Sequence, residues 1–233
     1  MAPPSILKSP VALARIALIA CAFQFSSIAW SEEQFARRPL LAKGDTWTYR
    51  TYTESASAGR QTATEQFTVT FVSDKVIIGT SNRIAGARQT ESDWSWTPDL
   101  NFVTTTIVGV SSEGDKITYS PHRGTFRFPL RPGDTYQADY DLITGTRDYT
   151  RVAFKFNRIA KVVGWEDVAV PAGRFRTLLV EAKGTIRFVA NGKSGPATDK
   201  LWYSPEVRAW VKFEVNNDGA KWQSELESYK LAE

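Results

Sequence analysis

The residues that usually carry catalysis or bind transition metals are scarce in this chain. It has one histidine, His122, and one cysteine, Cys21. Zinc and copper sites need three or four His or Cys ligands, and a Cys–His nucleophile needs both residues. The chain has no Gly-x-Ser-x-Gly, Walker or Gly-x-Gly-x-x-Gly motif. We therefore expect no catalytic residue, no metal site and no cofactor, and we place His122 in an exposed turn between Pro121 and Gly124.

The scarcity of histidine and cysteine still leaves open a function that depends on carboxylates. Acids stand beside aromatic residues in 93–99 (DWSWTPD) and 139–141 (DYD), as they would in a glycosidase or a calcium site. The structural alternative is that Asp99 lies in a turn after Pro98, and that the two acids of 139–141 face solvent from a strand. We favour this alternative and expect a protein that is not an enzyme, with a carboxylate enzyme as the remaining possibility.

Large aromatic side chains are the best candidates for contact with a ligand. Trp94 and Trp96 are two residues apart, so they share one face of a strand. That face could stack on a flat partner or fill the core, and both interpretations stay open. Trp210 stands between Arg208 and Lys212, which predicts an exposed indole. The further candidates for ligand binding are Trp165, Phe175 and Trp202.

The N-terminal segment 1–29 has the pattern of a secretory signal peptide. Lys8 and Arg15 precede an apolar run, residues 16–29, which ends in small residues before Trp30. This run is shorter than the ~20 residues of a membrane span. We expect cleavage after Ala29 and an exported protein, periplasmic or secreted, that is not an integral membrane protein.

A lipoprotein signal is the alternative at the same end of the chain. Residues 18–21 (LIAC) match the pattern in which the cysteine is acylated, which would make Cys21 a lipidation site and anchor the protein to the outer membrane. Against it, only five residues separate Arg15 from Cys21, and the apolar run continues past the cysteine.

The charge pattern argues against nucleic acid as a partner. Lysines and arginines number 29 against 25 acids. Without Lys8 and Arg15 the balance is 27 against 25, or about +2, and the charges are interspersed rather than gathered in a basic block.

Residues 38–230 predict a single all-β domain. Apolar and polar residues alternate with a period of two, as in antiparallel strands with one buried face. We expect about ten to thirteen strands in one curved antiparallel meander, either a half-barrel or a barrel, with at most one short helix around residues 32–42. In 67–72, Phe67, Val69 and Phe71 should share the buried face. The clearest strands are predicted at 67–72, 101–110, 115–120, 150–157, 208–215 and 221–230.

Two local patterns predict turns. In 167–181 (DVAVPAGRFRTLLVE), residues Pro171–Gly173 suit a three-residue hairpin loop with a bulge, which would place Val170 opposite Arg174. The segments 40–52 and 129–142 both contain Gly-Asp-Thr before an aromatic residue, 89 residues apart. They suggest either a duplicated half or a turn used twice, and we favour the turn.

The hairpin pattern also carries a resemblance to a known family. Residues 167–181 and 201–214 (LWYSPEVRAWVKFE) resemble the paired V-P-A-G-x-F and W-Y-x-P-E-V signatures of an exported bacterial family of domains of unknown function. The segment 128–136 (FPLRPGDTY) fits the same layout. The resemblance implies a curved antiparallel sheet in a cell-envelope protein. It implies no established activity, so it transfers no site residues.

The function that we expect is non-catalytic binding of an apolar or lipid-like ligand inside the curved sheet. A ligand pocket of this kind has a volume of ~300 Å³ or more. The alternative is a carbohydrate- or protein-interaction module that uses exposed tryptophans.

The processing of the N-terminus can be tested by intact-mass spectrometry of the protein purified from its native envelope. We expect a mature chain that begins at Trp30 and contains no cysteine. A chain that begins at an acylated Cys21 would instead establish the lipoprotein alternative.

Overall fold

Within the part of the chain that the structure describes, the alternating residues form thirteen antiparallel strands. The computed structural model describes residues 34–55, 59–108, 116–146 and 149–233, which belong to one unit, Glu33–Glu233. The segment 1–29 and Cys21 lie outside the described residues. The strands are β1 (Thr46–Ser55), β2 (Gly59–Val72), β3 (Ile77–Ala85), β4 (Arg88–Trp96), β5 (Phe102–Val108), β6 (Lys116–Ser120), β7 (Thr135–Gln137), β8 (Tyr140–Gly145), β9 (Thr150–Val170), β10 (Gly173–Phe188), β11 (Ser194–Ser204), β12 (Ala209–Asn217) and β13 (Ala220–Lys230).

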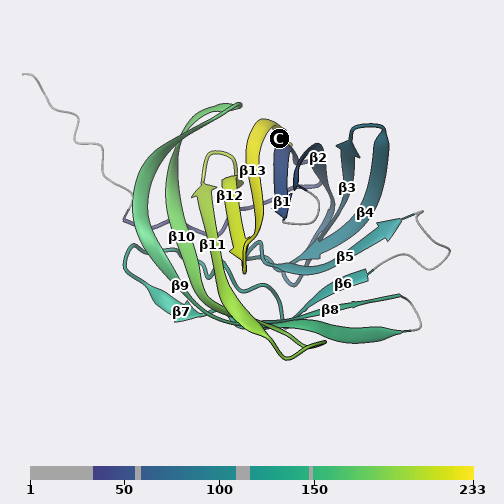
Figure 1. The fold of residues 1–233 in the computed structure, drawn as a ribbon. Coiled ribbons are helices and arrows are strands. Elements are labelled where there is room, and N and C mark those ends of the chain that lie inside the picture. The colour runs from purple at the N-terminus through teal and green to yellow at the C-terminus, as the bar shows by residue number, and fades with distance from the viewer. Residues whose placement is uncertain (1–33, 56–58, 109–115, 147–148) are drawn as a thin grey trace, which may run out of the picture. The chain divides into compact units, whose positions relative to one another are not determined.

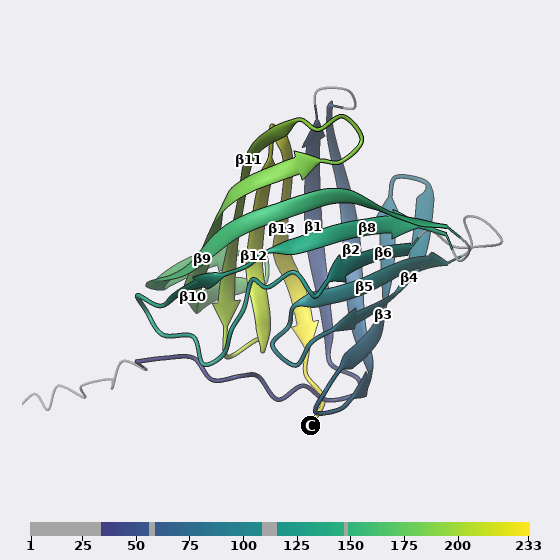
Figure 2. The same ribbon diagram turned by 90° about the horizontal axis from the view of Figure 1, so that it is seen from below.

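The sheet closes on itself as a barrel (Figure 1). Twelve strands follow the order β10-β11-β12-β13-β1-β2-β3-β4-β5-β6-β8-β9, and the ring closes because β9 also pairs with β10. The short β7 is an additional strand beside β9. Figure 2 shows β5, β6, β8 and β9 running across β12, β13, β1 and β2. The prediction of an all-β antiparallel sheet is confirmed, and the sheet is a closed barrel.

The expected helix around residues 32–42 does not form in its described part, 34–42. Instead, Ala36 and Leu130 exchange two backbone hydrogen bonds of 2.9 Å in an isolated β-bridge. No helix of the described residues is long and apolar enough to cross a membrane.

Two β-bulges overturn face assignments that strict alternation predicts. The register of β2 against β3 shifts between Val69 and Phe71. Val69 is therefore buried, while Phe71 is 52% exposed. In β12 the register skips Val211, because Trp202 pairs with Lys212 while Tyr203 pairs with Trp210. The extra residue turns Trp210 inward, where it is 4% exposed, so the prediction of an exposed indole is wrong.

The hairpin between β9 and β10 has a two-residue loop rather than the three-residue loop expected. Gly173 remains in the ladder opposite Val170, which shifts every pair by one and places Arg174 opposite Ala169. At the tip, the Ala172 amide donates to the Leu226 carbonyl at 2.9 Å. Since Leu226 is in β13, three strands from β10 in the sheet order, this motif joins distant strands of the barrel.

The Gly-Asp-Thr echo corresponds to one turn built twice. Gly44 and Gly133 have φ angles of 99° and 93°, which favour glycine. Each glycine amide donates to a neighbouring strand, to Val69 at 2.9 Å and to Val162 at 2.8 Å. Each valine amide returns a 2.9 Å bond to the aspartate carbonyl. This agrees with a turn used twice.

The barrel interior is filled mainly by aromatic side chains. Trp94 and Trp96 stack with their ring centroids 4.0 Å apart and are 2% and 1% exposed. Trp94 lies over Gly79, its cross-strand partner. A Cβ atom at Gly79 would come within 2.1 Å of the indole and 2.2 Å of the Thr68 carbonyl oxygen. The absence of a side chain at position 79 therefore sets the position of Trp94.

We expect Gly79→Ala to lower the free energy of unfolding by about 1–3 kcal/mol, the usual cost of overpacking a core. Urea denaturation followed by tryptophan fluorescence would measure it. The matched control is Thr80→Ala, on the exposed side of the same strand, which should change stability by less than about 0.5 kcal/mol. Equal stability of the two variants would contradict the close packing of Trp94 on Gly79.

Candidate functional site

The segment 121–130 has no regular structure and forms part of the candidate site; its buried residues are Arg123, Thr125, Phe126 and Leu130. Buried backbone groups need hydrogen-bond partners, and side chains supply several here. Asn101 bonds the amide and the carbonyl of Phe126, both at 2.8 Å. The Tyr136 hydroxyl donates to the Thr125 carbonyl at 2.7 Å. These bonds hold Arg123, which belongs to the segment, inside the barrel.

Arg123 belongs to a buried cluster of two arginines and one aspartate. Its Nε and Nη2 donate to Oδ2 of Asp199 at 3.3 and 3.0 Å. Arg158 donates to the same oxygen through Nη1 and to the Arg123 carbonyl through Nη2 at 3.0 Å. All three residues are at most 7% exposed. The cluster thus joins β9, β11 and the segment 121–130.

The two guanidinium groups keep Asp199 ionised. Burial alone would raise the pKa of Asp199, but the positive charges of Arg123 and Arg158 outweigh it and lower the pKa below its usual value. The Oδ1 atom of Asp199 is buried and accepts no hydrogen bond from a described residue. Both arginines therefore bind the carboxylate through Oδ2 alone.

An interior cavity of about 130 Å³ lies beside this cluster. Small polar side chains that point inward among the large rings, such as Thr51, Ser81 and Ser224, leave this space open. Its other lining residues are Tyr49, Glu65, Phe67, Trp94, Phe102, Thr105, Ile117, Tyr119, Arg123, Trp210, Phe213 and Trp222.

The cavity is smaller than the ~300 Å³ expected of a typical ligand pocket. It is close to the ~150 Å³ apolar cavity that is known to hold benzene. The available space thus fits a small ligand, and it is too small to enclose the acyl chain of a lipid.

The cavity has one acidic group of its own. Glu65 lies on the inner face of β2 and pairs with Arg83 of β3 at 3.5 Å. Burial raises the pKa of Glu65, and Arg83 only partly opposes this effect. The carboxyl group is therefore easier to protonate than an exposed glutamate.

The structure divides the six predicted ligand-binding residues into two groups. Trp94 and Trp210 line the cavity, and Trp96 is in ring contact with both. Because these three indoles are buried, they offer no surface for stacking on an external partner. Sequence reasoning missed Arg123 and Glu65, since a charged residue in a turn or an alternating strand ordinarily faces solvent.

Trp165, Phe175 and Trp202 are not among the residues that line the cavity. Trp202 is 8% exposed, and its indole donates to Glu166. The ring of Phe175 packs edge-on against Tyr229, with centroids 6.0 Å apart. Trp165 is half-buried. In the ladder, Trp165 and Phe175 stand near the tip of the β9–β10 hairpin, and Trp202 is on the adjacent strand β11, opposite Leu179.

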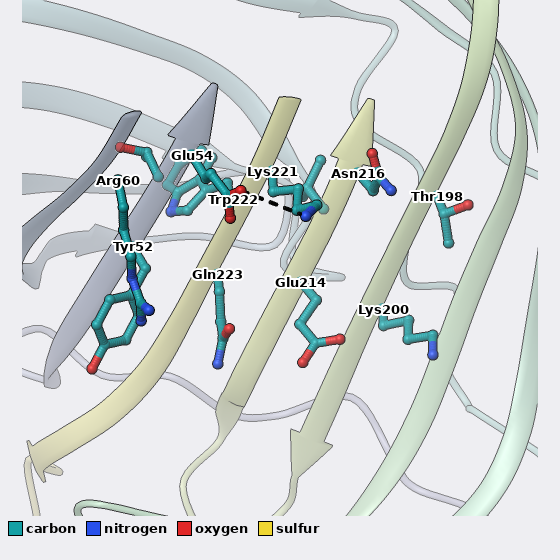
Figure 3. A pocket seen from close by; sticks show the side chains of 12 residues that line it. Tyr52, Glu54, Arg60, Thr198, Lys200, Glu214, Asn216, Lys221, Trp222 and Gln223 are labelled. Carbon is teal, nitrogen blue, oxygen red and sulfur yellow. Dashed lines mark ion pairs between the residues drawn. The ribbon is translucent and has the colours of Figure 1, made fainter. Parts of the chain in front are cut away.

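A second concave area lies over β1, β2 and β11–β13, where side chains project from neighbouring strands (Figure 3). It has a volume of about 510 Å³ and a polar lining. Lys221 pairs with Glu54 at 3.7 Å, and both side chains are 57% exposed. The Arg60 guanidinium lies 4.8 Å from the centroid of the Tyr52 ring and covers one of the aromatic rings there.

The histidine and the aspartates that the sequence analysis considered as catalytic or metal-binding candidates occupy structural positions. His122 is in a loop as expected, but it is half-buried rather than exposed, and burial lowers its pKa. Asp99 pairs with Arg38 at 2.5 Å. Asp139 accepts the Arg158 amide at 2.7 Å, and Asp141 pairs with Lys155 at 3.0 Å. In the described ranges, no group of three or more His, Cys, Asp or Glu residues is placed to hold a metal ion.

Known proteins resemble this chain in fold. No protein-family model and no curated protein matches it. One solved structure, from Bacteroides fragilis, is provisionally described as an exported protein with a YmcC-like fold. It matches this chain with a TM-score of 0.51 and 16% identity, and the match covers 84% of this chain and 99% of that chain. At this identity the likeness shows a shared fold.

Two further structures were found at lower similarity. One, from Parabacteroides distasonis, is provisionally described as a lipoprotein, with a TM-score of 0.47 and 15% identity over 84% of this chain and 99% of that one. The other is the hypothetical lipoprotein YmcC from Escherichia coli, with a TM-score of 0.41 and 7% identity over 78% of this chain and 84% of that one.

Replacing Asp199 tests the role of the buried charge cluster. We expect Asp199→Asn to lower the free energy of unfolding by about 3–5 kcal/mol, because it leaves two buried guanidinium groups without a counter-charge. Asp141→Asn breaks an exposed pair and should cost less than about 1 kcal/mol. Chemical denaturation at neutral pH would compare the two variants, and a small loss for Asp199→Asn would contradict this role.

The pH dependence of the same comparison follows from the sign of the pKa shift. Because the pKa of folded Asp199 is lowered, its stabilisation is present above the ordinary value of 3.8 and is lost as the pH falls from that value through the lower, folded value. The difference between wild type and Asp199→Asn should therefore persist at pH 4.

Proposed function

We propose that this protein is an exported, non-catalytic binding protein of the cell envelope, whose barrel holds a small apolar molecule in its interior cavity. The observation that carries the proposal is the cavity of about 130 Å³ with its predominantly aromatic lining. A void of this size costs stability when it is empty, and a ligand that fits would recover the lost contacts.

The proposed location in the cell envelope is supported by the sequence of the N-terminal segment. Residues 1–29 have the pattern of a signal peptide, and the Bacteroides fragilis protein with the same fold is provisionally described as exported. Cleavage after Ala29 would give a periplasmic or secreted protein. Acylation of Cys21 would instead give a lipoprotein with the barrel attached to a membrane.

The size of the cavity narrows the ligand class. An apolar cavity of ~150 Å³ accepts benzene, so the site suits a single ring or a short branched chain. Eight aromatic residues line it, and contacts between their rings and a ligand ring contribute beyond simple burial. A longer, lipid-like molecule could place only one end inside.

Filling the cavity tests the proposal. Ser224 faces inward between Phe213 and Thr51, its partners on the two neighbouring strands, and it is 4% exposed. We expect toluene, detected by ligand-observed NMR and by a rise in melting temperature, to bind the wild type. Ser224→Leu should remove this binding because the larger side chain occupies the space.

The matched control is Ser224→Ala, which leaves the cavity open and should bind toluene as the wild type does. Circular dichroism would establish that both variants are folded. Failure of toluene and of other single-ring compounds to bind the wild type would refute the proposed function, as would unchanged binding by a folded Ser224→Leu.

A further inference from the structure

The inward-facing charges around the cavity do not balance. Among the described residues, Arg123 and Arg158 share the single carboxylate of Asp199. Glu65 has its own partner, Arg83, at 3.5 Å. Three arginines therefore face two acids, which leaves one positive charge unmatched. An unmatched charge in a protein interior is costly, and an anion brought beside it relieves that cost.

Arg123 is the member of the cluster that reaches the cavity. It lines the space, whereas Arg158 is 1% exposed and is not part of the lining. Arg158 uses Nε, Nη1 and Nη2 in hydrogen bonds. Arg123 uses only Nε and Nη2, both toward Asp199. Its Nη1 makes no hydrogen bond to another described residue, so this charged donor is available to a ligand.

The surroundings hold the guanidinium in place. The centroid of the Phe213 ring lies 4.7 Å from the Arg123 guanidinium carbon. The Arg123 amide donates to the Phe102 carbonyl at 3.0 Å, and the Arg123 carbonyl accepts from Arg158. A donor held in this way binds an anion without a large loss of side-chain entropy.

We propose that the ligand of this cavity is a small organic carboxylate, with its carboxylate group on Nη1 of Arg123 and its apolar body between Trp94 and Trp210. This inference rests on the proposed function and specifies its ligand class. Charge-assisted bonds from arginine to a carboxylate are about twice as strong as neutral ones. The aromatic walls accept the body, and the cavity volume limits it to roughly one ring.

Benzoate and its neutral isostere benzamide provide the test, since they differ in charge at nearly constant shape. Isothermal titration calorimetry would measure both against the full-length mature protein at low salt. We expect benzoate to bind roughly ten-fold or more tightly than benzamide. Palmitate serves as a third probe and should bind no more tightly than benzoate, because its chain exceeds the cavity.

Replacing Arg123 tests whether this residue causes the preference for benzoate over benzamide. In Arg123→Gln, Asp199 retains Arg158, so the remaining buried pair is balanced and the fold should be kept. The benzoate preference should fall to less than about two-fold. The control, Arg127→Gln, removes the same charge from an exposed residue of the same segment and should retain the preference. Should Arg123→Gln not fold, Arg123→Lys keeps the charge but loses the second donor nitrogen, and a reduced preference is expected there.

The outcomes separate the two proposals. If benzoate, benzamide and toluene all fail to bind, the proposed function is wrong. If the neutral compounds bind as tightly as benzoate, the proposed function stands and the carboxylate inference is overturned. Tighter binding of palmitate would replace the small carboxylate with a fatty acid. A preference for benzoate that survives in both Arg123 variants would show that another group binds the anion.

Discussion

The carboxylate of Asp199 is the group on which much of the interior depends. Both guanidinium groups of the cluster converge on one of its oxygens, and Arg158 also bonds the backbone of Arg123. Breaking such a buried pair costs far more than its net contribution to stability suggests. The cluster thus ties the irregular segment 121–130 to β9 and β11, and this attachment places Arg123 in the cavity wall.

Side-chain size explains why one part of the barrel interior is densely packed while another part contains a cavity. Interiors are normally packed as densely as organic crystals, and this one is dense around Trp96, which contacts the rings of Trp94 and of Trp47 in β1. Gly79 makes room for one of these rings on the opposite strand. Next to them, Thr51, Ser81 and Ser224 are too short to fill the space between strands. The cavity therefore results from small residues at inward positions beside large aromatic rings.

Strand formation could be predicted from the sequence because alternation is a local property. The inward positions of Val211, Phe213 and Val215 in β12 follow directly from it. The errors at Phe71 and Trp210 come from bulges, each of which adds one residue to one strand, and alternation carries no signal for that extra residue. The hairpin error at Gly173 has the same origin, since a loop shorter by one residue shifts the whole register.

The candidate site was predictable only in its apolar part. Trp94 and Trp210 could be selected because tryptophans are few and large. Arg123 could not, because its burial depends on Arg158 and Asp199, which are 35 and 76 residues away in the chain. Partners this far apart in the chain meet only in the folded structure. A single sequence shows that charged residues are present, but not which of them will share an interior.

The pairing of β1 with β13 sets an order of events for the growing polypeptide. Residues 46–54 pair with β2 on one edge, but the partner of their other edge is at residues 221–230, so the first strand has one open edge until the last strand has been made. Long-range pairing of this kind slows folding. Because exposed strand edges and apolar faces promote association between chains, an unfinished barrel would gain from a factor that shields the edge of β1 until synthesis reaches the end of β13.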